Sequence, residues 1–228
     1  MTVNIYYVRH GDPNYELDTL TELGHKQAKL TSEVLKNISF DAIYASPSNR
    51  AVLTGSYLAD LVHQEMIKQD WLFEGKAWQN FASYNEKLQR FSWIYHNEYL
   101  LKKMEQLQHD DKWYEDKDFL PNVKEGIDRF MKEVDEWLLA MNIKHDRKNK
   151  TFTSIGDNPK NIVVFAHEGA GTGFLSSIMD MNYAYFMSNY PRLDCCSITQ
   201  IEITLDGETI NKFIRYNDTN HLKGLKNE

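Results

Sequence analysis

The stretch that decides the fold lies near the start of the 228-residue chain and reads Tyr6-Tyr7-Val8-Arg9-His10-Gly11. Its β-branched and aromatic residues predict a buried strand, roughly over residues 4–9, that ends in a glycine turn. In an α/β sheet, reactive groups gather at the carboxyl ends of the strands. Here an arginine supplies a planar charged fork suited to phosphate, and a histidine supplies a nucleophile or general base near neutral pH.

A second strand-end histidine and a second arginine occur farther along the chain. Residues 162–167 predict another buried strand, and this strand ends at His167. A strand over residues 40–45 is broken by Ser46-Pro47-Ser48, which begins a helix to about residue 62 and places Arg50 in its first turn. Backbone N–H groups and the helix dipole favour an anion there. We therefore expect Arg9, His10, Arg50 and His167 to converge at one edge of the sheet.

Two arginines and two histidines would make a pocket for a dianion, of which phosphate is the commonest in metabolism. A neutral imidazole could attack the phosphorus and carry the phosphoryl group as a phosphohistidine. Singly, each residue has a structural alternative, either a surface ion pair or a hydrogen-bonded histidine. A metal site is disfavoured because a carboxylate-rich ligand set is missing and the arginines would repel a cation. No cofactor is expected.

Composition limits the partners and the compartment. The net charge of −7 argues against nonspecific nucleic-acid binding, and no apolar stretch approaches the roughly 20 residues that a membrane span needs. The N-terminus lacks signal-peptide features, so a cytoplasmic protein is expected. Cys195 and Cys196 are adjacent, and we expect neither a disulfide nor a metal site from them, which fits a reducing compartment. The oligomeric state is left open.

The rest of the chain predicts alternating strands and helices. A helix is capped by Thr21, another covers residues 123–141, and the glycines at 169, 171 and 173 open a third that ends near residue 179. A strand over residues 197–205 turns at Asp206-Gly207 into a hairpin. Residues 145–160 are polar and predict a surface loop. Expected core positions of the first two helices are Leu23, Leu30, Val34, Leu35, Ile127, Phe130, Val134, Trp137 and Leu138.

Residues 71–119 differ from the rest, because they hold 12 of the 29 Phe, Trp and Tyr residues. We predict that most of these aromatic side chains pack a subdomain and that a few line a pocket. The expected fold class is α/β, a three-layer sandwich with a mostly parallel central sheet and helices on both faces. Residues 1–228 would form one domain, with residues 75–120 as a helical insertion, or cap, over the active-site edge. The apolar residues at mostly helical spacing are Leu88, Phe91, Ile94, Leu101, Met104 and Leu107.

The ordered motifs resemble the phosphoglycerate-mutase-like branch of the histidine phosphatase superfamily nearly end to end. The matching segments are Val8-Arg9-His10-Gly11, Leu20-Thr21-Glu22-Leu23-Gly24 with Gln27-Ala28, Ala45-Ser46-Pro47 with Arg50-Ala51 and Thr54, Ala166-His167, Cys196-Ser197, and Asn217-Asp218-Thr219 with His221-Leu222.

This resemblance implies a role for each site residue. His10 would be the phosphorylated nucleophile, and Arg9, Gly11, Arg50 and His167 would bind the phosphate. The family also uses a carboxylic acid that protonates the leaving oxygen and later deprotonates water. Glu74, in Trp71-Leu72-Phe73-Glu74-Gly75 with Trp78, matches the family's arrangement, and Glu86 is the second candidate. The alternative is that Glu74 is simply solvated.

The chain departs from the family in three places. Glu16 stands six positions past His10, where the family has an asparagine, and Asn14 is expected to take over that phosphate contact. The family's His-Gly becomes His167-Glu168. The Glu168 carboxylate either lies beside the phosphate, where it disfavours a highly anionic substrate, or points outward. The insertion offers only scattered cations, namely Lys76, Lys87 and Arg90.

The resemblance implies a metal-independent phosphomonoesterase that acts on a small phosphorylated metabolite with an uncharged or partly apolar leaving group. An α-ribazole-phosphate phosphatase is a narrower version of this hypothesis. A phosphoglycerate mutase is the first alternative, but it needs basic residues for the glycerate carboxylate. A phosphate-binding regulatory protein with little turnover is the second, although loss of the nucleophile would be its mark and His10 is present.

Overall fold

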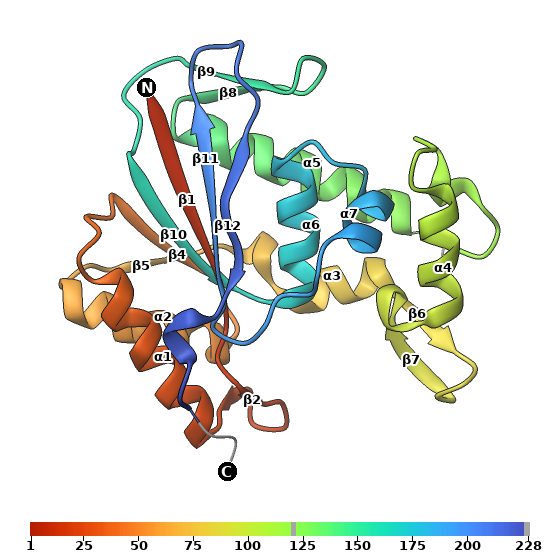
Figure 1. The fold of residues 1–228 in the computed structure, drawn as a ribbon, viewed down its shortest axis with the longest axis horizontal. Coiled ribbons are helices and arrows are strands. Elements are labelled where there is room, and N and C mark those ends of the chain that lie inside the picture. The colour runs from red at the N-terminus through yellow and green to blue at the C-terminus, as the bar shows by residue number, and fades with distance from the viewer. Residues whose placement is uncertain (120–121, 226–228) are drawn as a thin grey trace.

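The computed structural model describes residues 1–119 and 122–225, and its centre is a six-stranded sheet in the order β12-β11-β1-β10-β4-β5 (Figure 1). Strands β1, β10, β4 and β5 run parallel to one another, whereas β11 is antiparallel to β1 and β12 is antiparallel to β11. The mostly parallel sheet is therefore confirmed, and β5 is a strand that the sequence did not predict. The strands are β1 (Thr2–Arg9), β4 (Ala42–Ala45), β5 (Met66–Lys68), β10 (Asn161–Ala166), β11 (Ile198–Thr204) and β12 (Lys212–Asp218).

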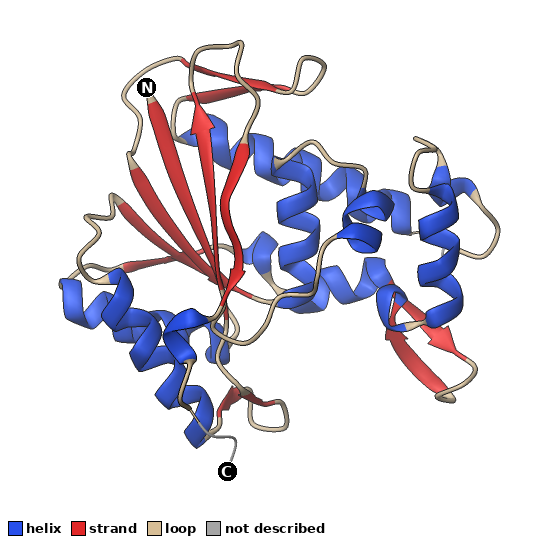
Figure 2. Ribbon diagram, viewed as in Figure 1, coloured by secondary structure: helices blue, strands red, loops and turns tan. Residues whose placement is uncertain are grey.

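Helices cover both faces of this sheet, which confirms the three layers (Figure 2). On one face lie α1 (Glu22–Leu35) and α2 (Asn49–Val62). On the other lie α5 (Val123–Ala140) and α6 (Glu168–Ile178), with α3 (Glu74–Phe81) and α7 (Tyr183–Asn189) packed against α6. Within the described ranges, no helix combines the length and the apolar character needed to cross a bilayer.

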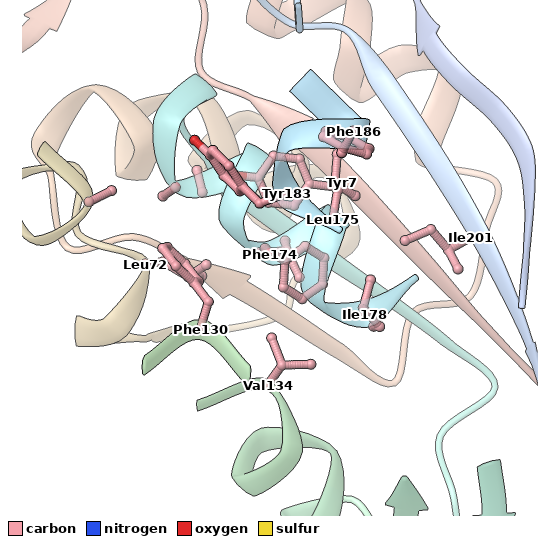
Figure 3. Close-up of a cluster of buried hydrophobic side chains, with 14 of the residues drawn as sticks. Tyr7, Leu72, Phe130, Val134, Phe174, Leu175, Ile178, Tyr183, Phe186 and Ile201 are labelled. Carbon is pink, nitrogen blue, oxygen red and sulfur yellow. The ribbon is translucent and has the colours of Figure 1, made fainter. Parts of the chain in front are cut away.

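The two faces of β1 build two separate cores. Tyr6 and Val8 pack with Leu35 of α1 and Leu58 of α2. The alternate positions, such as Tyr7, face α6, where the Tyr7 ring stacks on Phe174 at 5.4 Å between ring centroids (Figure 3). Because a central strand of such a sheet is covered on both faces, it has an apolar run rather than an alternating pattern.

Most of the predicted helices are confirmed. The Thr21 hydroxyl caps α1 by accepting a hydrogen bond from the Gly24 N–H at 3.1 Å. Leu35 is buried as predicted, but Val34 is 46% exposed, so its assignment to the core was wrong. Small and polar residues such as Ala28 and Thr31 occupy the inner face of α1 instead. A pattern based on large apolar residues does not detect such a face.

Residues 75–120 contain a hairpin that the helical prediction missed. Strands β6 (Ala82–Asn85) and β7 (Arg90–Trp93) pair antiparallel, and α4 (Glu98–Leu107) follows. Leu88 and Phe91 lie in this hairpin and are exposed, so their placement on a helix was wrong. Three-residue spacing also occurs by chance where a chain turns between two strands. Helix α4 packs on α7, beyond the helical layer rather than directly on the sheet (Figure 1).

Residues 145–160 lie mostly at the surface, as predicted, but the prediction that they form a loop was wrong. This segment contains the antiparallel pair β8 (Ile143–Asp146) and β9 (Thr151–Ser154). The His145 side chain is buried there, with its two ring nitrogens 2.7 Å and 2.8 Å from carboxylate oxygens of Asp135 and Asp180. These partners come from α5 and from the turn after α6. A single polar side chain within a surface segment can thus be buried when charges from distant elements satisfy it.

Candidate active site

Three strand ends meet at one place, as the sequence predicted. His10 follows β1, His167 follows β10 and Ser46 follows β4. The register pairs Arg9 with Ala166, and the His10 N–H donates to the Ala166 carbonyl at 2.9 Å. The ring centroids of His10 and His167 are consequently 5.2 Å apart.

His10 is held as a neutral imidazole whose Nε2 is unprotonated. It is 2% exposed, and its Nδ1 lies 2.7 Å from the Gly11 carbonyl oxygen. Because a carbonyl only accepts, Nδ1 carries the proton and Nε2 keeps its lone pair. Burial, helped by the charges of Arg9 and Arg50, lowers the pKa of His10 to about 3. The ring therefore stays neutral, the form that a nucleophile requires.

His167 is fixed by two residues that the sequence analysis did not identify. Its Nε2 lies 2.7 Å from the Ser46 hydroxyl. The Tyr7 hydroxyl donates to the His167 carbonyl at 2.8 Å and accepts from its N–H at 3.2 Å. Burial, with the charges of Arg50 and Arg9, lowers the pKa of His167. The strand-end position of Ser46 was a usable signal, whereas nothing in the sequence distinguished Tyr7.

Each predicted arginine is paired with a carboxylate. Arg9 lies 3.2 Å from Glu168 and donates to the Leu193 carbonyl, while Arg50 pairs with Asp18. The Arg9 and Glu168 side chains are only 15% and 14% exposed, so the outward-facing alternative for Glu168 was wrong. Asp18 was missed, since it lies in a loop without a motif of its own. The two cations therefore converge, but in balanced ion pairs.

Glu74 also belongs to this cluster. It is the first residue of α3, and its two carboxylate oxygens accept from the Gly169 N–H at 3.0 Å and the Ala170 N–H at 2.8 Å. Burial raises its pKa to about 7, although these hydrogen bonds and the two arginines oppose the shift. The solvated alternative for Glu74 is thus wrong. Glu86, the second candidate, is exposed in the turn between β6 and β7.

The insertion forms one wall of the site with aromatic side chains that the sequence analysis did not single out. Trp93, at the end of β7, packs closely against Gly169, so that a β-carbon on residue 169 would overlap the Trp93 ring. The Tyr95 ring stacks on Trp93 with centroids 5.5 Å apart and is 2% exposed. Burial and the charges of Glu168 and Glu74 raise the pKa of Tyr95 well above its ordinary value. Within the described ranges, no three His, Cys, Asp or Glu side chains gather in a way that could hold a metal ion.

The sequence pattern of the histidine phosphatase superfamily (branch 1) matches residues 5–218. The chain belongs to this superfamily.

Two kinds of relatives support this assignment. Phosphoserine phosphatase 1 of Hydrogenobacter thermophilus is 36% identical over 81 residues, which are 32% of this chain and 38% of that protein. The match therefore spans well under half of the relative. Among solved structures, a mycobacterial glucosyl-3-phosphoglycerate phosphatase superposes with a TM-score of 0.62 at 17% identity, covering 95% of this chain and 99% of the other. Entamoeba histolytica phosphoserine phosphatase gives 0.61 at 20% identity, with coverage of 96% and 99%. At these identities the structures show a shared fold.

Gly11 and Asn14, which follow His10, take part in the packing and hydrogen bonding of the loop after β1. The Gly11 N–H donates to the Thr54 hydroxyl at 3.0 Å, and a β-carbon at Gly11 would lie 2.6 Å from the Gly24 carbonyl oxygen. Gly11 therefore allows close packing, and its N–H is already occupied. The Asn14 side chain accepts from the Leu17 N–H at 3.2 Å, a contact within its own turn. The contact of Asn14 with phosphate stays a prediction.

The superfamily motif near the C-terminus supports Arg9 from the other side. Asn217 accepts from the Asp194 N–H at 2.7 Å and donates to its carboxylate at 2.8 Å. The Cys196 N–H donates to the Arg9 carbonyl at 3.0 Å. These bonds fix the loop whose Leu193 carbonyl accepts from Arg9. Cys195 and Cys196 are free thiols.

Proposed function

We propose that this protein is a phosphomonoesterase that transfers the phosphoryl group to His10 and then to water, without a metal ion. The observation that carries the proposal is the state of His10. It is a buried, neutral imidazole with an occupied Nδ1, set among two arginines and a second histidine. A neutral ring nitrogen beside bidentate phosphate binders is what a phosphohistidine mechanism requires.

In the first half-reaction, Arg9, Arg50 and His167 would bind the phosphate oxygens, taking over the contacts that Glu168 and Asp18 make with the arginines. The His10 Nε2 lone pair forms the N–P bond while the bond from phosphorus to the leaving oxygen breaks. The protonated Glu74 carboxyl donates its proton to that oxygen, and the alcohol departs. Because the pKa of Glu74 is about 7, the protonated form is populated near neutral pH.

In the second half-reaction, the Glu74 carboxylate takes a proton from water, and the water oxygen attacks the phosphorus. The N–P bond breaks, phosphate leaves, and His10 and Glu74 return to their starting forms. The hydrogen bonds from Gly169 and Ala170 keep the Glu74 side chain in place through both steps.

The substrate that we propose is a small phosphorylated metabolite, which agrees with the names of the phosphoserine and glucosyl-3-phosphoglycerate phosphatases that this chain resembles. We assign residues 75–120 as the specificity cap of a single domain, supported by the contact of Trp93 with Gly169 and by the burial of Tyr95. A cytoplasmic location is part of the proposal, and the two free thiols are consistent with it.

The test is phosphate release from a panel of phosphomonoesters, including 3-phosphoglycerate, in excess EDTA. We expect turnover that survives EDTA and disappears in His10→Ala. His109→Ala is the matched control, because His109 is exposed just after α4 and its ring centroid lies 6.1 Å from that of Tyr185 on α7. The same samples of 3-phosphoglycerate are analysed for 2-phosphoglycerate. Isomerisation without phosphate release would support the mutase instead, and a folded protein that binds phosphate without any turnover would support the regulatory alternative.

A further inference from the structure

Glu168 has one carboxylate oxygen that no side chain of the site uses. Its Oε2 lies 3.2 Å from Arg9, whereas Oε1 is buried and has no hydrogen-bond partner among the described residues. Buried acceptors in proteins nearly always have a donor. Since Glu168 lies immediately after His167 and contacts the phosphate-binding Arg9, the missing donor is expected to come from the part of the substrate next to the phosphate.

Tyr95 presents a second acceptor of the same kind. Its ring is 2% exposed, and its hydroxyl also lacks a hydrogen-bond partner within the described residues. Tyr95 lies on the Glu168 side of the site, because its ring stacks on Trp93 and Trp93 packs against Gly169, the residue after Glu168. The Tyr95 and Trp93 rings stack within 9° of parallel. A carboxylate oxygen, a phenol oxygen and aromatic faces are the groups that bind an alkylammonium ion.

The charge balance of the site favours a cation as well. The charges of Arg9 and Arg50 are already matched by Glu168 and Asp18. The positive charge of Arg192 lowers the pKa of Glu168, and the negative charge of Asp194 raises it, so these two charges oppose each other. A phosphate dianion therefore adds two negative charges to a site whose own charges nearly cancel. An anionic leaving group would worsen this excess, while a positive charge on the leaving group would offset it.

We propose that Glu168 and Tyr95 bind an ammonium group on the leaving group, so that the preferred substrates are phosphate monoesters of amino alcohols. The inference rests on the proposed phosphatase function and narrows its substrate class. The ammonium N–H groups donate to Glu168 Oε1 and to the Tyr95 hydroxyl oxygen, while the phosphate occupies Arg9 and Arg50. This places a positive charge where the sequence suggested an uncharged group.

The test compares phosphoethanolamine with n-propyl phosphate, which differ in an ammonium against a methyl group of similar size. The quantity measured is the ratio of their kcat/KM values. In the wild type we expect phosphoethanolamine to be preferred by roughly 10- to 100-fold, the range for hydrogen bonds to charged groups. Glu168→Gln should lower this ratio about 10-fold or more. Tyr95→Phe, which keeps every charge, should lower it by roughly 2- to 10-fold.

Glu98→Gln is the matched control, because it makes the same carboxylate-to-amide change at an exposed position of the insertion, where Glu98 pairs with Lys87, and it should keep the wild-type ratio. Circular dichroism checks that each variant is folded. A wild type that hydrolyses both esters equally, or a ratio that survives both Glu168→Gln and Tyr95→Phe, would overturn the ammonium site and leave the phosphatase intact. If no ester is hydrolysed, p-nitrophenyl phosphate included, the proposed function fails and the ammonium site fails with it.

Discussion

Glu74→Gln separates acid catalysis from all other contributions to the rate. The amide keeps the size of the side chain and one acceptor oxygen for Gly169 or Ala170, but it carries no transferable proton. With a pKa of about 7, roughly half of the Glu74 side chains are protonated at pH 7 in the wild type. Loss of a general acid costs about 10²- to 10⁴-fold, so we expect kcat/KM for an alkyl phosphate to fall within this range.

The same variant should behave differently with p-nitrophenyl phosphate, whose phenolate leaves without a proton. The first half-reaction then needs no acid, but hydrolysis of the phosphohistidine still needs the base. Stopped-flow absorbance should show a burst of about one nitrophenolate per enzyme followed by slow turnover. Glu86→Gln, in the exposed turn between β6 and β7, is the control and should keep wild-type rates. Unchanged rates in Glu74→Gln, or an equal loss with both esters and no burst, would refute the role of Glu74.

Three further predictions follow from individual contacts. Gly169→Ala places a methyl group into the Trp93 ring and should lower stability by about 1–3 kcal/mol, measured by thermal denaturation; a wild-type melting temperature would contradict the contact. For alkyl phosphates, kcat/KM should fall as the pH rises through about 7, because protonated Glu74 is lost, and Glu74→Gln should remove this limb from the pH profile. Burial lowers the pKa of His145, but the hydrogen bonds to Asp135 and Asp180 outweigh it, and the pKa is raised. Protonated His145 therefore stabilises the folded state fully below about pH 6.5, and this stabilisation is lost as the pH rises through the folded-state pKa. His145→Gln should thus destabilise the protein more at pH 6 than at pH 9 in paired thermal melts, and an equal loss at both values would contradict that protonation.

The sheet and the strand-end residues could be predicted because local chemistry determines them. The apolar runs before His10 and His167 form buried parallel strands, and the break at Ser46-Pro47 starts a helix with Arg50 in its first turn. Parallel strands bring their carboxyl ends to one edge of the sheet, independently of the structure of the connecting loops. The convergence of these residues therefore follows from fold class alone.

The residues that tune the site could not be predicted, because they come from distant parts of the chain. Asp18 reaches Arg50 from a loop, Tyr7 holds His167 across two strands, and Tyr95 comes from a short helical turn after β7. The hairpin β6–β7 was mistaken for helix because three-residue spacing occurs in both. Buried polar networks such as the one around His145 likewise depend on partners that a sequence window does not contain.

The most direct test of the central claim is the detection of phosphate on His10. The enzyme is mixed with ³²P-labelled phosphomonoester, quenched within milliseconds in alkaline denaturant, and digested for mass spectrometry. We expect up to one acid-labile, alkali-stable phosphate per chain, located on the peptide that contains His10, and none in His10→Ala. Steady turnover with no label on His10 under these conditions, or label on another residue, would contradict the mechanism.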